Sequence, residues 1–315
     1  MSKQDFLFEL GTEELPPGAL LSLSNALGKS LTAQLNDAQL TFSSLELFAA
    51  PRRLAVLVKT LDSQQPDRNI EKRGPSAKAP EQAAKGFAGS CGVSLEDLVI
   101  ENTDKGDYYV YRGTEVGKPA SELLPGMLET ALSSLPIPKR MRWAASRTEF
   151  VRPVKWIVAL LGDEVLPCTL LEVTSGRKSR GHRFHYPHDI ELMTASEYAT
   201  TLRNTGKVIA SFAERREIIR QQVLAEASRI GGTAEIDEDL LDEVCALNEW
   251  PVALAGRFEE RFLEVPEQVL ILSMKENQKY FHLVDGNNKL MPYFITISNI
   301  ESKDPQQVIA GNEKV

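Results

Sequence analysis

The sequence has few cysteines and no long apolar run. Its three cysteines, Cys91, Cys168 and Cys245, are far apart and form no C-x-x-C pair, which argues against a disulfide framework and against a thiolate zinc site. No stretch approaches the length of a membrane span, and the N-terminus lacks the apolar centre and the cleavage site of a secretory signal. From these absences we expect a cytoplasmic protein that has no membrane partner.

Common nucleotide-binding and catalytic motifs are absent as well. The sequence contains no G-x-G-x-x-G, G-x-S-x-G or H-E-x-x-H pattern, and Leu23 stands where the first glycine of a P-loop ending in Gly28-Lys29-Ser30 would be. The pair Glu13 and Glu14 has the chemistry of a general acid and base, but the helix dipole already favours two acidic residues in a first helical turn. We interpret the pair as part of a helix start and predict no catalytic residue in this chain.

Three of the four histidines follow one another at intervals of three residues, at His182, His185 and His188. On a helix this spacing would align metal ligands, but Gly181 and Pro187 argue against a helix, and on a strand His182 and His185 face opposite sides. We therefore predict no metal site, and favour a nucleic-acid-binding or a structural role for these histidines.

The composition is that of a folded protein with an α/β to α+β fold. At 315 residues, with 42% hydrophobic and 25% charged residues, the chain is long enough for one large or two ordinary domains. Strand and helix patterns are interspersed, which predicts two lobes of mixed sheets flanked by helices. We expect an N-terminal lobe over residues 1–145, and a second lobe over 146–300 that carries a basic segment and a helical insertion.

Periodicity predicts the individual elements of these lobes. Alternating or continuous apolar runs predict strands over 6–10, 45–49, 54–61, 108–116, 156–161, 166–173, 280–284 and 293–297. Apolar residues at helical spacing predict helices over 12–35, 81–89, 120–135, 195–204, 212–230 and 237–248. The turn Asp285-Gly286-Asn287-Asn288 indicates a hairpin, Gly231-Gly232 is expected to end a helix, and 62–80 is expected to form a polar loop.

Positive charge is concentrated in residues 136–188. This segment has ten basic and four acidic residues, whereas the whole chain has a net charge of −8. A basic face on an otherwise acidic protein is typical of polyanion binding, although a solvated basic surface is the simpler interpretation of a charge cluster.

Several long motifs occur in order along the chain. They are FELGTEELPP at 8–17, APRRLAV at 50–56, KRGP at 72–75, LPIPKRMRW at 135–143, FVRPVKWIVALLGDEVLP at 150–167, RGHRFHYP at 180–187, EWPVALAGRFEERFLEVP at 249–266 and NIESKDPQQVIAGNEKV at 299–315. Together they resemble the beta subunit of bacterial heterotetrameric (alpha2-beta2) glycyl-tRNA synthetases, over the whole chain. The chain thus resembles an N-terminal fragment of such a subunit.

The resemblance implies a division of labour between two subunits. Glycine activation, with ATP and Mg, is expected on the alpha subunit, so that no cofactor is expected in this chain. The beta subunit is expected to bind tRNA for glycine and to assemble with the alpha subunit as part of a glycine–tRNA ligase. The resemblance further implies a fold similar to the tRNA-editing module of the phenylalanyl-tRNA synthetase beta chain, and a connection to a further C-terminal part that starts at 301–315.

If the basic segment binds tRNA, its cationic side chains are the candidate phosphate contacts. The tRNA-binding residues that we predict are Arg140, Arg142, Arg147, Arg152, Lys155, Arg177, Arg180, His182 and Arg183. The aromatic residues Trp143, Phe184 and Tyr186 are candidates for stacking on bases, and equally for the core.

Two alternatives to a noncatalytic tRNA-binding role stay open at this point. One is an aminoacyl-tRNA deacylase, which the resemblance to an editing module suggests but which fold analogy does not establish. The other is a pure assembly module, which would hold the alpha subunit through apolar faces such as residues 154–161.

Overall fold

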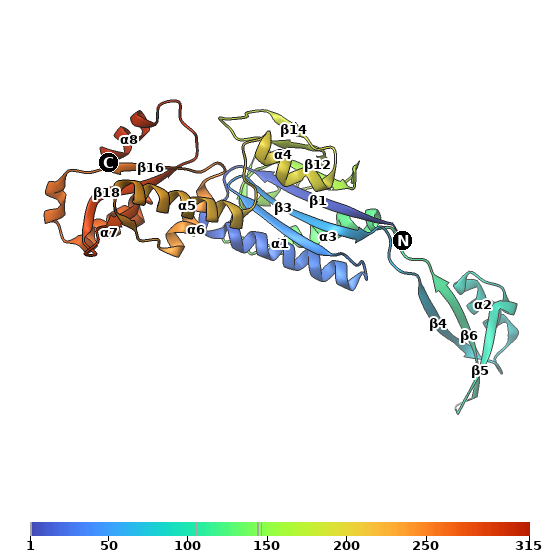
Figure 1. The fold of residues 1–315 in the computed structure, drawn as a ribbon. Coiled ribbons are helices and arrows are strands. Elements are labelled where there is room, and N and C mark those ends of the chain that lie inside the picture. Colours follow the sequence, from blue (N-terminus) through green and yellow to red (C-terminus); the bar gives the residue numbers. More distant parts are fainter. Residues whose placement is uncertain (1, 105, 144, 146) are drawn as a thin grey trace.

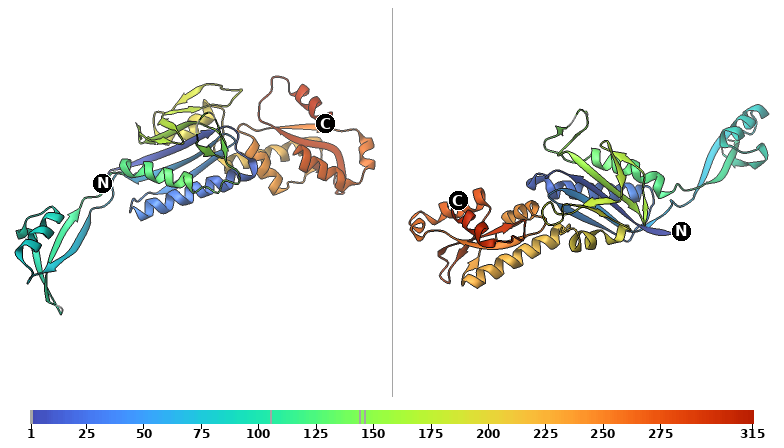
Figure 2. Two further views of the ribbon diagram at one scale, coloured as in Figure 1. Left: turned by 180° about the vertical axis from the view of Figure 1, so that it is seen from behind. Right: turned by 90° about the horizontal axis from the view of Figure 1, so that it is seen from above.

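The computed structural model describes residues 2–104, 106–143, 145 and 147–315. It has a central sheet and two smaller lobes, one at each end of an elongated molecule (Figures 1 and 2). The mixed α/β architecture with several sheets confirms the predicted class at this level. Every helix in the described part of the chain is too short or too polar to cross a membrane.

The central sheet has seven strands, most of them antiparallel. Its order is β11 (Thr169–Leu170), β12 (Val173–Gly176), β9 (Val154–Leu161), β1 (Lys3–Thr12), β3 (Arg53–Asp62) and β2 (Ser44–Ala50), and β10 (Glu164–Val165) also pairs with β9. The short loop between β2 and β3 confirms the hairpin-like pair predicted around residues 51–53. Gly162, with a φ of 64°, provides the tight turn between β9 and β10.

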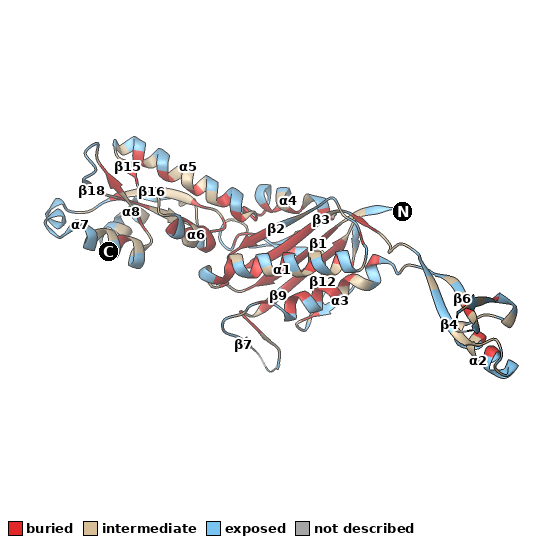
Figure 3. Ribbon diagram, turned by 90° about the horizontal axis from the view of Figure 1, so that it is seen from below, coloured by how far each residue is buried: buried red, intermediate tan, exposed pale blue. Residues whose placement is uncertain are grey.

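The central sheet is buried on both faces because its strands are apolar at successive positions. Phe6 and Phe8 of β1 belong to the same buried cluster as the leucines of α1 (Pro17–Asp37) and α3 (Ala120–Ser133). Leu7 belongs to a cluster on the other face, with η2 (Ala195–Glu197) and α4 (Tyr198–Asn204). Figure 3 shows the buried strands between these helices. Each large side chain buried here contributes about 1.5–3 kcal/mol.

One sheet contains strands from both sides of the predicted boundary at residue 145. Leu7 of β1 pairs with Leu160 of β9 on one edge and with Leu57 of β3 on the other. The periodicity of a strand shows which of its residues are buried but not which distant strand it pairs with. The residues on both sides of 145 therefore share one sheet.

A small lobe is inserted between β3 and α3. Its sheet has the order β4 (Arg68–Ser76), β6 (Gly106–Glu115) and β5 (Leu98–Thr103), and it includes α2 (Glu81–Cys91) and the single turn η1 (Leu95–Asp97). The prediction of a polar loop over 62–80 was wrong, because β4 is a polar strand that is held by pairing with β6. Two adjacent segments connect this lobe to the body, and they are joined by a hydrogen bond from the Gln65 amide to the Lys118 carbonyl.

The C-terminal lobe is a four-stranded sheet with helices. The sheet has the order β15 (Thr233–Ala234), β17 (Phe281–Val284), β18 (Leu290–Ser298) and β16 (Val252–Arg257). Its helices are α5 (Phe212–Ile230), α6 (Glu238–Leu247), η3 (Glu260–Glu264), α7 (Glu267–Leu272), the π-helical turn η4 (Ser273–Gln278) and α8 (Pro305–Glu313). The predicted hairpin over 285–288 and the helix end at Gly231, which has a φ of 84°, are confirmed.

Two short hairpins complete the described structure. One is formed by β7 (Met141–Arg142) and β8 (Glu149–Phe150), which lies on the side of the sheet that Figure 3 shows below β9. The other is formed by β13 (Lys178–Arg180) and β14 (Asp189–Glu191), and its loop contains the three spaced histidines. This second hairpin carries the last part of the basic segment, from Lys178 to His188, and its strand β13 contacts β1 and β9 of the central sheet.

Candidate functional site

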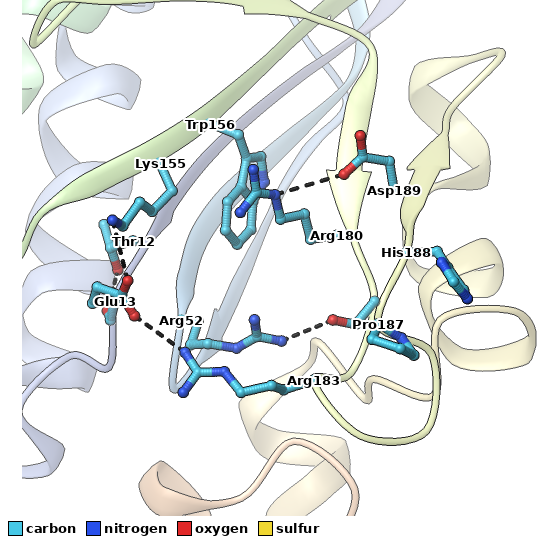
Figure 4. Close-up of a pocket in the computed structure, with 11 residues that line it drawn as sticks. Thr12, Glu13, Arg52, Lys155, Trp156, Arg180, Arg183, Pro187, His188 and Asp189 are labelled. Atoms are coloured by element: carbon cyan, nitrogen blue, oxygen red, sulfur yellow. Dashed lines mark hydrogen bonds and ion pairs between the residues drawn. The ribbon is translucent and has the colours of Figure 1, made fainter.

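A pocket of about 260 Å³ lies where the end of β1, the start of β9 and the β13–β14 hairpin meet. Figure 4 shows its side chains around a central hollow. The charged side chains that line it are Glu13, Arg52, Lys155, Arg180, Arg183 and Asp189. Four of these six are cationic, which is the charge pattern of an anion-binding site.

Backbone hydrogen bonds hold the ends of three strands together below the pocket. The amide of Thr12 donates to the carbonyl of Arg52 over 2.8 Å, and the amide of Glu13 donates to the carbonyl of Pro153 over 3.0 Å. Glu13, Arg52 and Lys155 therefore lie on adjacent segments, although they are distant in sequence. The site depends on the central sheet for its shape.

The cations at the mouth of the pocket pair with carboxylates. Lys155 Nζ lies 3.2 Å from Glu13 Oε1, and Arg183 lies 3.1 Å from Glu13 and 2.9 Å from Glu14. Partial burial by itself raises the pKa of Glu13, but hydrogen bonds and charge from Lys155 and Arg183 outweigh it and lower that pKa. Because α1 begins only at Pro17, the interpretation of Glu13 and Glu14 as its first turn was wrong.

Two buried arginines support the wall of the pocket from below. Arg52 Nη2 donates to the carbonyl of Gly181 over 2.8 Å, and Arg53 Nη2 donates to the carbonyl of Arg180 over 2.7 Å. These two bonds hold the backbone that carries Arg180 and Arg183. Glu249, from the segment between α6 and β16, lies 2.9 Å from Arg52 and 3.5 Å from Arg53.

Glu9 of β1 completes this buried network. Its carboxylate accepts hydrogen bonds from Arg53 over 3.2 Å and from Ser179 over 2.6 Å, and from the side chains of Trp156 and Tyr198. Burial, and secondly the charge of Glu9, raise the pKa of Tyr198, so this phenol donates and stays neutral. In this network the two arginines Arg52 and Arg53 are balanced by the two carboxylates Glu9 and Glu249. Removal of either carboxylate would leave one buried positive charge uncompensated.

Burial and neighbouring charges act in opposite directions on the pKa of Arg53 and on that of Glu249. Burial alone lowers the pKa of Arg53 and raises that of Glu249. The charges of Glu9 and then of Glu249 outweigh burial and raise the pKa of Arg53, and the charges of Arg53 and Arg52 outweigh burial and lower the pKa of Glu249. Both groups are therefore charged at neutral pH.

Three of the nine predicted tRNA-binding residues line this pocket. They are Lys155, Arg180 and Arg183, and each is exposed to solvent. Arg180 lies 3.6 Å from Asp189 and its guanidinium lies 5.3 Å from the centre of the Trp156 ring. All three cationic side chains therefore face solvent at the hollow, and each lies beside a carboxylate.

His182 differs from the other predicted tRNA contacts because it is fully buried. Its side chain is 0% exposed, and its Nδ1 accepts hydrogen bonds from the amides of Phe184 and His185. Burial lowers its pKa, which keeps the imidazole neutral. These two hydrogen bonds hold the loop around the imidazole, and His182 is not among the residues that line the pocket.

The remaining predicted residues lie outside the pocket. Arg177 donates to the carbonyls of Asp163 and Leu192, which ties two loops together. Arg142 pairs with Glu149 across the β7–β8 hairpin, and Arg152 donates to the carbonyl of Val151. Arg140 lines a second hollow of about 220 Å³ near Phe150, and Arg147 is exposed.

The aromatic candidates differ in their exposure. Phe184 is 72% exposed beside Arg183, whereas Trp143 and Tyr186 are partly buried against core clusters. Of these three rings that of Phe184 is the most exposed, and an exposed aromatic ring can stack on a nucleobase. The segment 154–161 is a different case, because it is β9, whose apolar residues from 156 to 160 are buried in the central sheet. The suggestion that it forms an assembly surface was therefore wrong.

Sequence reasoning missed the buried network. The signal was present in Arg52 and Arg53, two consecutive arginines between two apolar strands. Such residues are almost never buried without partners, so distant acids were to be expected.

Within the described residues, no group of three or more His, Cys, Asp and Glu side chains is arranged to hold a metal ion.

Comparison with known proteins gives matches along the whole chain. The family model described as glycyl-tRNA synthetase beta subunit matches residues 6–315. The chain is 54% identical over 322 residues to the glycine–tRNA ligase beta subunit of Hahella chejuensis, which covers 100% of this chain and 46% of that protein. It is also 54% identical over 323 residues to that of Marinobacter nauticus and 55% identical over 321 residues to that of Chromohalobacter salexigens. These alignments cover 100% of this chain, with 47% and 46% of the two relatives. The chain thus spans about half the length of these curated relatives.

Proposed function

The chain belongs to the glycyl-tRNA synthetase beta subunit family, and from this premise we propose that it is the N-terminal part of such a subunit, which supports ATP-dependent attachment of glycine to tRNA. The observation that carries the proposal is the family match over residues 6–315, which includes the pocket and the network below it.

The contribution that we propose for this chain is binding of tRNA. The support is chemical: Lys155, Arg180 and Arg183 line a hollow of about 260 Å³ and are partly exposed, and Phe184, which follows Arg183 in the sequence, is exposed. Cationic forks bind phosphates, and an aromatic ring stacks on an unpaired base. Such a site suits a single-stranded or unstacked part of tRNA better than a regular helix, whose deep groove side chains cannot read. Arg140, Arg142 and Arg147 form a second candidate contact area.

The chemistry of charging is assigned to another subunit in this proposal. The relatives are named as one subunit of a glycine–tRNA ligase. We assign ATP, Mg and glycine activation to an alpha subunit, and we propose this alpha subunit and tRNA for glycine as the partners of the chain, in the cytoplasm. The residues of this chain would hold and orient the tRNA.

We also propose that the fold is similar to the tRNA-editing module of the phenylalanyl-tRNA synthetase beta chain. The support is the mixed central sheet with helices on both faces. Superposition of the two structures tests this: a common strand order supports the similarity, and a different order contradicts it. Similarity of fold carries no deacylase activity by itself.

Aminoacylation by the complete enzyme tests the proposed function. The beta subunit would carry Lys155→Ala, Arg180→Ala and Arg183→Ala together, and a matched control would replace the exposed residues Lys29, Lys78 and Lys85. We expect kcat/KM for tRNA to fall by about tenfold or more in the triple variant, because phosphate contacts supply much of the binding energy. Glycine-dependent exchange of pyrophosphate into ATP would persist. Unchanged charging by the triple variant would contradict the proposal.

A further inference from the structure

A carboxylate bridges two cations at the mouth of the pocket. Glu13 Oε1 lies 3.2 Å from Lys155 Nζ, and Glu13 Oε2 lies 3.1 Å from Arg183 Nη2 (Figure 4). Two anionic oxygens on two cationic donors is also the arrangement by which a phosphate group binds Lys and Arg. Glu13 therefore lies where the oxygens of an incoming phosphate would meet these two donors.

We propose that the pocket is a binding site for one phosphate group, and that the carboxylate of Glu13 occupies the position of this phosphate until a phosphate displaces it. The inference rests on the proposed function, since tRNA is the polyanion that would supply the phosphate. It goes further in naming the group that binds, the cations that receive it, and a carboxylate that competes with it.

A buried arginine provides an independent sign of a built site. Arg52 lines the pocket and is 8% exposed. Its Nε and Nη2 donate to Glu249, and Nη2 also donates to the carbonyl of Gly181. Nη1 makes no hydrogen bond to any residue that the structure describes, and Figure 4 shows a guanidinium nitrogen of Arg52 directed at the hollow. A rigidly held arginine with one donor left over is suited to an anion in that hollow.

Displacing Glu13 costs little. The side chains of Glu13, Lys155 and Arg183 are 37%, 42% and 49% exposed, so each ion pair between them is worth only about 0–1 kcal/mol. Arg183 keeps its second partner, Glu14, at 2.9 Å. A phosphate that accepts from Arg52, Lys155 and Arg183 together would replace two weak pairs by three charge-assisted bonds.

Glu13 has one further effect, because a carboxylate repels a phosphate. It stays ionised at neutral pH, so the competition persists there. If Glu13 only held Lys155 and Arg183 in position, its removal would weaken binding. If it occupies the phosphate position, its removal must strengthen binding. The two roles therefore predict changes of opposite sign.

Binding of glycine tRNA to the 315-residue chain separates the two roles. The variants are Glu13→Gln, the matched control Glu14→Gln, Arg183→Ala, and Glu13→Gln combined with Arg183→Ala. Glu14 also pairs with Arg183, but it does not line the pocket. We expect Glu13→Gln to tighten binding about fivefold at constant salt, because one negative charge beside the phosphate is removed. We expect Glu14→Gln to change tRNA affinity by less than about twofold. We expect the gain in affinity from Glu13→Gln to be smaller when it is combined with Arg183→Ala.

The outcomes distinguish this inference from the proposed function. Weaker or unchanged binding by Glu13→Gln, with weaker binding by Arg183→Ala, overturns the inference and leaves the tRNA-binding role in place. No effect of Arg183→Ala overturns both at this site. A parallel series replaces chloride by inorganic phosphate at constant ionic strength. If inorganic phosphate competes with tRNA and this competition depends on Arg183, the site binds phosphate groups in general. If inorganic phosphate does not compete, but Glu13→Gln still tightens tRNA binding, the site binds the phosphate of a polynucleotide.

Discussion

Replacement of Glu249 by alanine is expected to destabilise the central sheet by about 3–5 kcal/mol, the usual cost of removing one partner from a buried ion pair. The carboxylate of Glu249 is 2.9 Å from Arg52 and 3.5 Å from Arg53, and all three residues are buried. Without it, Arg53 keeps only Glu9 as a carboxylate partner within 4.0 Å among the described residues, and Arg52 keeps only the carbonyl of Gly181.

Equilibrium urea unfolding followed by tryptophan fluorescence measures this loss. Trp156 donates to Glu9 within the same network and therefore reports on the sheet that carries it. The matched control is Glu264→Ala, which removes an exposed glutamate of the same lobe and is expected to change the free energy of unfolding by less than about 0.5 kcal/mol. A loss below about 1 kcal/mol for Glu249→Ala would refute the reasoning, because a buried arginine pair cannot lose a carboxylate at so low a cost.

Three further predictions follow from neighbouring contacts. The pKa of Glu249 is lowered from 4.5 in the folded chain, so its contribution is complete above pH 4.5 and is lost as the pH falls through the folded pKa. The stability difference between wild type and Glu249→Gln should therefore shrink in urea unfolding below pH 4.5; a constant difference would contradict this assignment. Gly11→Ala should lower the melting temperature strongly, because a Cβ at this position would lie 1.9 Å from the Trp156 ring; an unchanged melting temperature would show that the ring is free to move. Phe184→Ala should weaken tRNA binding by about 1–3 kcal/mol with little change in salt dependence, since stacking involves no counterion release; equal affinities in a binding titration would exclude a stacking role.

Local patterns were sufficient for elements that are stabilised within a short segment. The leucine spacing of α1, the end of α5 at Gly231 and the hairpin turn at 285–288 each depend on neighbouring residues. All three were predictable because helical periodicity and turn chemistry are properties of a few consecutive residues.

Pairing between strands and side chains that are far apart in the sequence could not be predicted from local patterns. β9 pairs with β1 across about 150 residues, and β4 is a strand because β6 lies beside it, although its own residues are mostly polar. Arg52 and Glu249 are 197 residues apart in sequence, so no local pattern shows that each is buried by the other. The candidate site was found in part, through the exposed cations, whereas its buried support required the structure.

Binding of unmodified glycine tRNA to the chain across a salt series tests the central claim most directly. The comparison is between wild type and the variant with Lys155→Ala, Arg180→Ala and Arg183→Ala. We expect wild-type affinity to fall steeply with salt, and the variant to bind more weakly with a shallower slope of log K against log[salt], because phosphate neutralisation in this pocket is lost. Equal slopes and equal affinities, or no binding by either chain, would contradict tRNA recognition by this pocket.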